Sequence, residues 1–177
     1  QNEGVTLNDL TYVSLLKACK NLRNLERGRD LHTEIAKEGF ESDVFVTSSL
    51  LDMYSKCGSL NEAFRMFDRI QKPDIVAWNA MIAACVYCHD DKCALEVFDK
   101  VFNQKDVKPN HSTYVAILKA CASIGTGADF AWIHVDIILS GIEMDVLIGT
   151  ALVNMYGKCG DPLATLSAFL NMQEHNV

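Results

Sequence analysis

The chain has 177 residues and a formal net charge of −7 at neutral pH, with 49% hydrophobic and 22% charged residues. This is an ordinary globular composition, and no apolar run approaches the length that a membrane-spanning helix requires. The acidic balance disfavours indiscriminate binding of polyanions. The seven cysteines are odd in number and recur with the sequence period, so they favour a reducing compartment over a disulfide framework.

The first helical pattern in the chain returns 102 residues further on. Leu15–Cys19 (LLKAC) is matched by Ile117–Cys121 (ILKAC), and at the same offset Ser48–Gly58 (SSLLDMYSKCG) is matched by Thr150–Gly160 (TALVNMYGKCG). One offset shared by two separate matches indicates repeating units. An apolar pair divides the block further, at steps of 35, 31, 36 and 35 residues: Leu15-Leu16, Leu50-Leu51, Met81-Ile82, Ile117-Leu118 and Leu152-Val153.

We therefore expect five repeats, at residues 9–43, 44–74, 75–110, 111–145 and 146–176. Residues 1–8 would end a preceding repeat, and Val177 would begin the next one. Because the sequence also lacks an initial Met, we expect an interior fragment of a longer protein.

Each repeat begins with a predicted amphipathic helix. Counted from the first residue of a repeat, positions 4, 7, 8 and 11 are mostly apolar or aromatic, which is the spacing of one helix face. In the first repeat these residues are Tyr12, Leu15, Leu16 and Cys19, and in the third they are Trp78, Met81, Ile82 and Cys85.

A second helix is predicted after a short turn. Its apolar stripe occupies positions 20, 24 and 27, as in Ala63, Phe67 and Ile70, then Ala94, Phe98 and Val101. Ser59 with Glu62 predicts a capping box, and Asp161-Pro162 predicts an N-cap followed by Pro in the first helical turn. Two such helices cannot bury both stripes alone, so we expect neighbouring pairs to stack into a solenoid.

Polar residues recur at two positions that packing does not explain. Position 5 holds Val13, Ser48, Asn79, Val115 and Thr150. The last position holds Asp43, Asp74, Asn110, Asp145 and Asn176, and Asn8 ends the preceding repeat. Asp and Asn cap a following helix well, although Ser and Thr would cap too. A second interpretation is that the two side chains together read one base edge at each step of the stack.

The chain resembles the pentatricopeptide repeat family, specifically the plant organellar class in which P, L and S repeats alternate. The resemblance covers nearly the whole chain. It rests on LLKAC, LERGRDLH, GFESDVF, DMYSKCGSL, AFRMFD, DIVAWNAMI and VKPN, at Leu15–Cys19, Leu25–His32, Gly39–Phe45, Asp52–Leu60, Ala63–Asp68, Asp74–Ile82 and Val107–Asn110. It implies an all-α, right-handed α-solenoid of helix-turn-helix repeats, in the order L, S, P, L, S from residue 9 to residue 176.

Members of this family read single-stranded RNA at one base per repeat. The resemblance implies that the fifth and last residues of each repeat select the base. Ser48 with Asp74 implies guanine, Asn79 with Asn110 a pyrimidine with cytosine preferred, and Thr150 with Asn176 adenine. The L repeats, with Val13 and Asp43 and with Val115 and Asp145, have a poorly defined readout. The implied target is 5′-N-G-C/U-N-A-3′.

Two further sets of residues follow from the resemblance. The second residue of a repeat sandwiches the base, and here it is Leu10, Phe45, Val76 and Leu147, with Ser112 departing from the pattern. Lys56 and Lys158, at position 13, match a lysine that approaches the RNA backbone. The implied setting is a mitochondrion or chloroplast, where the protein would direct RNA editing or other RNA processing. Editing cofactors or a deaminase domain would be further partners, and no membrane is involved.

Catalytic and metal-binding patterns are weak. Cys85-Val86-Tyr87-Cys88-His89 is a C-x-x-C-H string, but Cys85 falls on the packing stripe and no second C-x-x-C completes a zinc site. His32-Thr33-Glu34 is an H-x-E string, yet His32 and His134 share position 24 with Phe67, Phe98 and Phe169, which indicates packing. Gly125-Thr126-Gly127 lacks the lysine of a phosphate loop. We expect no catalytic role and no cofactor.

The alternative function is a helical-repeat scaffold that binds a protein or peptide partner, as tetratricopeptide repeats do with their period of 34 residues. The steps here alternate between 31 and 36, and the W-x₂-L-G-x₂-Y signature is absent.

Overall fold

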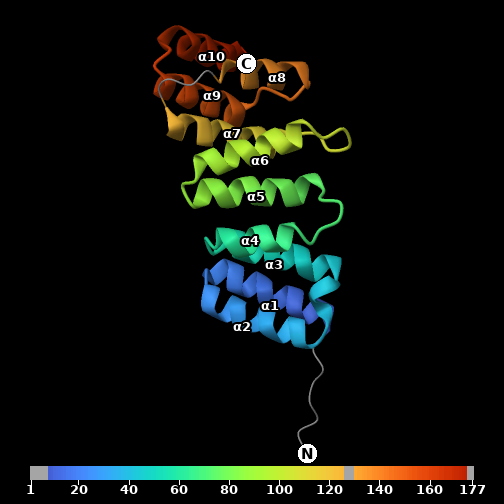
Figure 1. Ribbon diagram of the computed structural model, residues 1–177. Coiled ribbons are helices and arrows are strands. Elements are labelled where there is room, and N and C mark those ends of the chain that lie inside the picture. Colours follow the sequence, from blue (N-terminus) through green and yellow to red (C-terminus); the bar gives the residue numbers. More distant parts are fainter. Residues whose placement is uncertain (1–7, 126–129, 175–177) are drawn as a thin grey trace, which may run out of the picture. The chain divides into compact units, whose positions relative to one another are not determined.

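The computed structural model describes residues 8–125 and 130–174 (Figure 1). Over these residues it contains helices and turns and no strand, so the all-α prediction is confirmed. The chain divides into two compact bodies, an N-terminal body of residues 1–88 and a C-terminal body of residues 89–177. No helix in the described ranges combines the length and apolar character needed to cross a bilayer.

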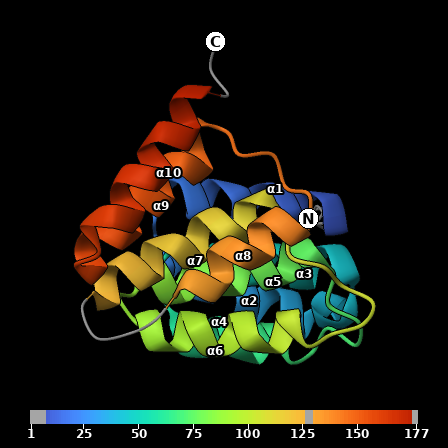
Figure 2. The same cartoon turned by 90° about the horizontal axis from the view of Figure 1, so that it is seen from above.

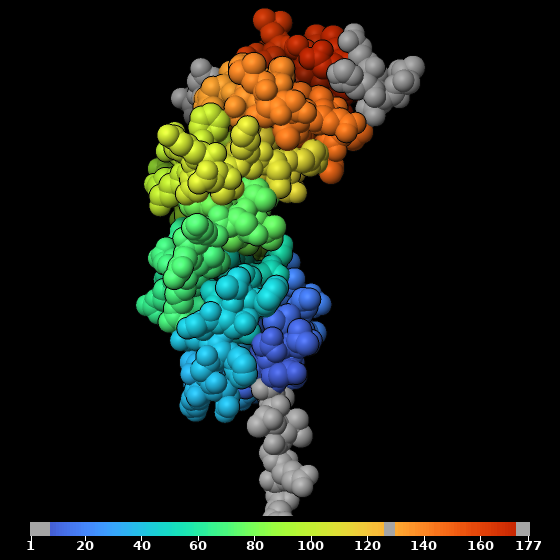
Figure 3. Space-filling model, turned by 90° about the vertical axis from the view of Figure 1, so that its right-hand side faces the viewer, coloured from blue at the N-terminus to red at the C-terminus, as the bar shows by residue number. Residues whose placement is uncertain are grey.

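The N-terminal body consists of α1 (Asp9–Leu22), α2 (Leu25–Lys37), the 3-10 turn η1 (Phe40–Ser42), α3 (Val44–Lys56), α4 (Leu60–Phe67) and α5 (Ile75–Tyr87). Helices α1 and α2 form an antiparallel hairpin, and α3 packs against α1, α4 and α5 (Figure 1). The space-filling view shows the segment around η1, in light blue, at the surface beside the dark blue α1 (Figure 3).

The C-terminal body consists of α6 (Asp91–Phe102), α7 (His111–Ile124), α8 (Ala131–Leu139), α9 (Val146–Cys159) and α10 (Pro162–Glu174). Helix α9 packs against α7 on one side and α10 on the other. Figure 2 shows α9 and α10 lying side by side. Asx residues stand at the start of α2, α6 and α10, where Asn24, Asp90 and Asp161 accept backbone hydrogen bonds.

An Asp or Asn side chain is the N-cap of each of the helices α1, α3, α5, α7 and α9. Asp74 Oδ1 accepts a hydrogen bond from the Ala77 N–H at 2.9 Å, and Asn110 forms a full capping box with Thr113. The other caps are Asn8, Asp43 and Asp145. Each cap satisfies at least one of the N–H groups that a helix N-terminus leaves without a partner, and Asp43 satisfies two.

Of the two capping signals predicted for second helices, the one at Asp161 is confirmed and the one at Ser59 is not. Asp161 Oδ1 accepts from the Ala164 N–H at 2.9 Å, and α10 begins at Pro162, as expected. The capping box at Ser59 is wrong. Its hydroxyl donates to Glu62 Oε2 at 2.6 Å and makes no cap hydrogen bond. The Glu62 carboxylate accepts this charge-assisted hydrogen bond, which is the largest cause of the lowered pKa of Glu62.

The predicted apolar stripes form the core, with three corrections, at Leu15, Ile70 and Phe169. Leu16, Met81, Ile82 and Cys85 are fully buried, but Leu15 is 37% exposed and Phe169 in α10 is 45% exposed. No helix precedes α1 in the described part of the chain, whereas α3, in which the matching Leu50 is fully buried, packs against both α1 and α5. In the second stripe, α4 ends at Phe67, so Ile70 lies in the loop beyond the helix and is half-buried.

Candidate nucleic-acid interface

Helices α1, α3, α5, α7 and α9, which are the first helices of the predicted repeats, have two distinct faces. An α-helix turns by about 100° per residue, so positions 4, 7, 8 and 11 of a repeat share one side, which is the packed one. Positions 2, 5, 9 and 13 fall within an arc of about 80° on the other side. We call this second side the outward face. It contains every position that the sequence assigned to RNA contact, except the capping residue itself.

Position 2 places large apolar side chains in solvent. The exposed fractions are 69% for Leu10, 73% for Phe45, 70% for Val76 and 61% for Leu147, and Ser112 at the same position is also exposed. Burial of the same groups elsewhere is what holds the fold together, so one such residue at the start of four of the five first helices is not explained by packing. An apolar group of this kind can lie against the flat face of a planar ring.

Position 5 lies beside this row. Ser48 and Thr150 are exposed, and Val13, Asn79 and Val115 are half-buried. Contacts within a hairpin therefore do not enclose any of the five side chains. Their hydroxyl and amide groups are of the types that donate and accept hydrogen bonds at a base edge.

The last position of each repeat is a helix cap in all five described cases, Asn8, Asp43, Asp74, Asn110 and Asp145. Asn176 lies outside the described residues. The caps of Asp43 and Asp74 use Oδ1 alone, so the second carboxylate oxygen is not engaged by the cap. For Asp145, the backbone N–H of Ile148 and then the side chain of His111 hold the pKa below its ordinary value. The capping interpretation is thus confirmed, and at Asp43 and Asp74 the cap occupies only one of the two carboxylate oxygens.

Lysines lie on the same outward face. Lys56 and Lys158 at position 13 are exposed, as are Lys17 and Lys119 at position 9. Among the described residues, no carboxylate lies within ion-pair distance of these four. Lys20 differs, because it points toward Asp52 and pairs with it at 2.7 Å. The sequence reasoning missed Lys17 and Lys119, although both stand inside the recurring LKAC motif that revealed the repeats.

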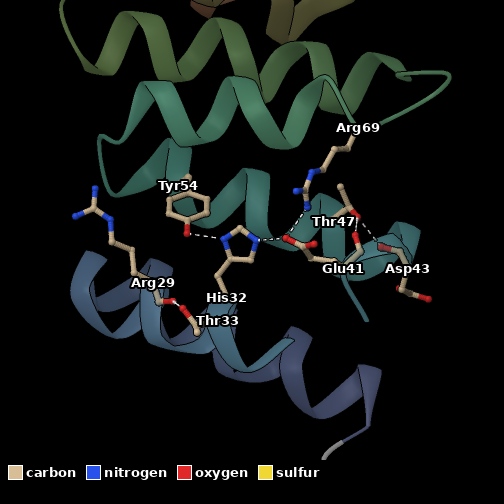
Figure 4. A network of polar contacts seen from close by, with 8 residues as sticks. All are labelled: Arg29, His32, Thr33, Glu41, Asp43, Thr47, Tyr54 and Arg69. Atoms are coloured by element: carbon tan, nitrogen blue, oxygen red, sulfur yellow. Dashed lines mark hydrogen bonds and ion pairs between the residues drawn. The ribbon is translucent and has the colours of Figure 1, made fainter. Parts of the chain in front are cut away.

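A polar network holds the neighbouring repeats of the N-terminal body together (Figure 4). His32 of α2 lies between Tyr54 of α3, at 2.8 Å, and Glu41, at 2.9 Å. Arg69 pairs with Glu41 at 2.6 Å, and this contact is the main reason why the pKa of Glu41 is lowered. Burial raises the pKa of Tyr54 to about 12. His32 therefore serves packing, as position 24 predicted.

Thr47 ties the same network to the candidate interface. Its hydroxyl donates to the carbonyl of Asp43 at 2.8 Å and to that of Glu41 at 3.0 Å (Figure 4). These bonds hold the backbone of the capping residue Asp43 against η1. The position of the Asp43 backbone is thus set by contacts within the protein.

The described residues contain no group of three or more His, Cys, Asp or Glu side chains arranged to hold a metal ion. Cys85 is fully buried on the packing stripe. Burial also raises the pKa of Cys121 to about 12, so this thiol is held protonated in the core.

The helix order and the outward face define an all-α helical-repeat protein. A model described as "Pentatricopeptide repeat domain" matches residues 70–123, and a model described as "PPR repeat" matches residues 45–75 and 150–177. Together these ranges cover more than half of the chain. The chain belongs to the pentatricopeptide repeat family.

Named relatives and a solved structure agree with this. The chain is 36% identical over 170 residues to the chloroplastic pentatricopeptide repeat-containing protein At4g18520 of Arabidopsis thaliana, covering 96% of this chain and 27% of that protein. It is 40% identical over 124 residues to the mitochondrial At3g02330 of the same plant, covering 69% of this chain and 13% of that protein. The crystal structure of the pentatricopeptide repeat protein PPR10 in complex with an 18-nucleotide psaJ RNA element matches with a TM-score of 0.79 at 23% identity, over 98% of this chain and 25% of that one.

These matches show the fold to be a helical-repeat solenoid. The chain spans less than a third of the length of the curated relatives that it matches.

Proposed function

We propose that this chain binds single-stranded RNA along the outward faces of α1, α3, α5, α7 and α9, with one base per repeat. The observation that carries the proposal is the coincidence of three features on one helix face. Exposed apolar side chains stand at position 2, accessible residues at position 5, and exposed lysines without ion-pair partners at positions 9 and 13. The chain as a whole is acidic, so these lysines are a local feature of the face that would meet phosphates.

The apolar and polar rows suit different parts of a nucleotide. Leu10, Phe45, Val76 and Leu147 would each lie against a base, since stacking contacts are worth roughly 1–3 kcal/mol per base. The side chains at position 5 and at the capping position would then face the base edge, where a good hydrogen-bonded pair discriminates by about 1–3 kcal/mol. The bound order would be 5′-N-G-C/U-N-A-3′.

The repeat boundaries follow the caps. We propose repeats at residues 9–43, 44–74, 75–110, 111–145 and 146–176, of L, S, P, L and S type. In this scheme Asp43, Asp74, Asn110 and Asp145 each close one repeat and start the first helix of the next. The base-selecting pairs are those named for the family resemblance. Asn176 completes the last of them.

The setting is an organelle. Two of the matched Arabidopsis proteins are named chloroplastic and mitochondrial, and the PLS-like order of repeats supports a role in RNA editing or another processing step. Three well-defined bases are too few for a tight specific site once the ordering of a flexible strand is included. The intact protein would therefore use further repeats.

Fluorescence anisotropy with labelled RNA tests the proposal. The chain is titrated with a 10-nucleotide RNA that contains 5′-A-G-C-A-A-3′ and with RNAs in which these bases are permuted. The affinity should be highest for the first RNA and should fall with added salt, because phosphate contacts release counterions. Equal affinity for every permutation would reject the base assignment. No salt-dependent binding to any RNA, together with capture of a protein partner that survives nuclease and high salt, would favour the protein-binding scaffold.

A further inference from the structure

The third repeat lacks a cation of its own on the outward face. Position 9 or position 13 is a lysine in each of the other four repeats: Lys17, Lys56, Lys119 and Lys158. In the repeat that begins at Ile75 these positions are Ala83 and Tyr87, and no residue of α5 carries a charge. A strand that followed the outward faces would meet no positive side chain of α5 itself.

Arg23, the residue that caps the carboxyl end of α1, places its guanidinium group against Tyr87 of α5. Its Nη1 donates to the hydroxyl of Tyr87 at 2.5 Å, and its guanidinium carbon lies 4.9 Å from the centre of the Tyr87 ring. The two residues are 64 positions apart in sequence, and both belong to the N-terminal body. Tyr87 stands at position 13, where the second and fifth repeats have Lys56 and Lys158.

The turn after α3 allows this contact. A Cβ atom added to Gly58 would lie 3.3 Å from Cε1 of Tyr87, so the absence of a side chain lets the ring lie on the turn. Arg23 is close enough to the neighbouring Cys57 to act on the pKa of its thiol, which burial raises and Arg23 lowers. Arg23 and Tyr87 therefore lie together at the carboxyl end of α3.

The backbone of Arg23 is in an unfavourable conformation. It has φ 50° in the left-handed region, where it caps α1 by donating its N–H to the carbonyls of Cys19 and Lys20. The residue 102 positions later, after α7, is Gly125 with φ 76°. Glycine adopts positive φ without steric cost, whereas arginine does not. Strained backbone conformations cluster at functional sites, so the conformation of Arg23 points to a role for its side chain.

Arg23 also keeps its full charge. Over residues 8–125 and 130–174, no carboxylate lies within ion-pair distance of it, in contrast to Arg29 with Glu62 and Arg69 with Glu41. Arg23 is exposed, and its partner Tyr87 is 42% exposed. A guanidinium has five N–H donors, so a bond to one hydroxyl leaves donors for a phosphate. A cation is needed here, because the carboxyl ends of helices carry partial negative charge and repel an anion.

We infer that Arg23, held on the ring of Tyr87, is a phosphate-binding residue for the RNA backbone at the third repeat and takes the place of the lysine found in the other repeats. The inference rests on the proposed function. Tyr87 acts as the positioning residue, because its ring and hydroxyl fix the guanidinium over the turn at Gly58.

The test is the salt dependence of RNA affinity for the 177-residue chain and its variants, measured between 50 and 200 mM NaCl with the same labelled RNA. Loss of one phosphate contact to a single strand lowers the slope of log K against log [salt] by about 0.7. We expect this decrease for Arg23→Gln, with an equal loss of affinity for every base permutation. Arg27→Gln is the matched control, because Arg27 is an exposed arginine of the same body that pairs with Asp30; its slope should not change.

A rescue variant separates a phosphate contact from a structural one. In Arg23→Gln/Tyr87→Lys the charge returns directly at position 13, so the slope should return to its original value. If Arg23→Gln lowers the melting temperature but leaves the slope unchanged, the pair only connects helices and the inference is overturned. If the wild-type chain binds no RNA, the proposed function is overturned. If it binds RNA but Arg23→Gln leaves the slope unchanged, only the inference about Arg23 is overturned.

Discussion

Nδ1 of His32 in α2 lies 2.8 Å from the hydroxyl of Tyr54 in α3. The contact recurs 102 residues later, where Nδ1 of His134 in α8 lies 3.0 Å from the hydroxyl of Tyr156 in α9. The rings meet at 65° in the first pair and 62° in the second. The MYSKCG and MYGKCG motifs therefore include a tyrosine that joins its first helix to the second helix of the repeat before it.

The two pairs differ in the charge around the histidine. His32 also contacts Glu41, and Glu41 in turn pairs with Arg69, whereas burial lowers the pKa of His134. The neutral form of His134 is thus favoured in the folded C-terminal body. Stability from this site should be present above the ordinary histidine pKa of about 6.5 and should be lost as the pH falls through that value toward the lower folded pKa.

Thermal unfolding between pH 8 and pH 5 measures this effect. The double variant His134→Phe/Tyr156→Phe should unfold with a weaker pH dependence, because it removes the titrating group and its hydroxyl partner together. His89→Gln, which changes an exposed histidine, should behave as the wild type. An unchanged pH dependence in the double variant would contradict the assignment to His134.

The observed capping role of Asp74 can be separated from its proposed role in base selection. Asp74→Asn preserves an oxygen for the Ala77 N–H, and Asn caps as well as Asp. We expect unchanged stability and a shift of preference at the second repeat from guanine toward adenine, since Ser48 with Asn would resemble the proposed adenine pair, Thr150 with Asn176. Asp74→Ala should instead cost about 1 kcal/mol in the free energy of unfolding. Chemical denaturation and RNA anisotropy report the two effects, and Asp74→Asn would refute the pairing if it left the base preference unchanged.

The position-5 residues should change specificity more than affinity. Asn79→Asp and Thr150→Asn are each expected to move the preference of their repeat toward uracil. The measurement is a titration with RNAs that carry all four bases at the corresponding nucleotide. Because Thr150 is exposed, Thr150→Asn should not alter the melting temperature. The same order of bases before and after both substitutions would show that the code is misassigned.

Phe45 and Phe98 provide a contrast between binding and stability. Phe45 is 73% exposed at position 2, so Phe45→Ala should weaken RNA binding by roughly 1–3 kcal/mol with little effect on unfolding. Phe98 is 1% exposed in the core of the C-terminal body, and Phe98→Ala should cost roughly 3–5 kcal/mol of stability. Denaturation curves of both variants and anisotropy of Phe45→Ala provide the comparison. A Phe45→Ala variant that unfolds early would show that this side chain serves packing instead.

Several structural features were predictable from short-range patterns. The spacing of Met81, Ile82 and Cys85 predicted a buried helix face, and the Asx residues predicted where first helices begin, because both depend on side chains three or four residues apart. The same patterns failed at Leu15, where burial depends on whether another helix is present. They also failed at Ser59, whose hydroxyl donates to the Glu62 carboxylate and does not accept from the backbone N–H as a capping box requires.

The sequence by itself determined the helical repeats, their caps and the residue types that face outward, since periodicity and capping are local properties of the chain. Only the tertiary structure decided that Arg23 meets Tyr87 across 64 residues and that His32 lies between Tyr54 and Glu41. Such contacts depend on how three successive helices stack and on which rotamers fit between them. No spacing within one helix encodes that geometry.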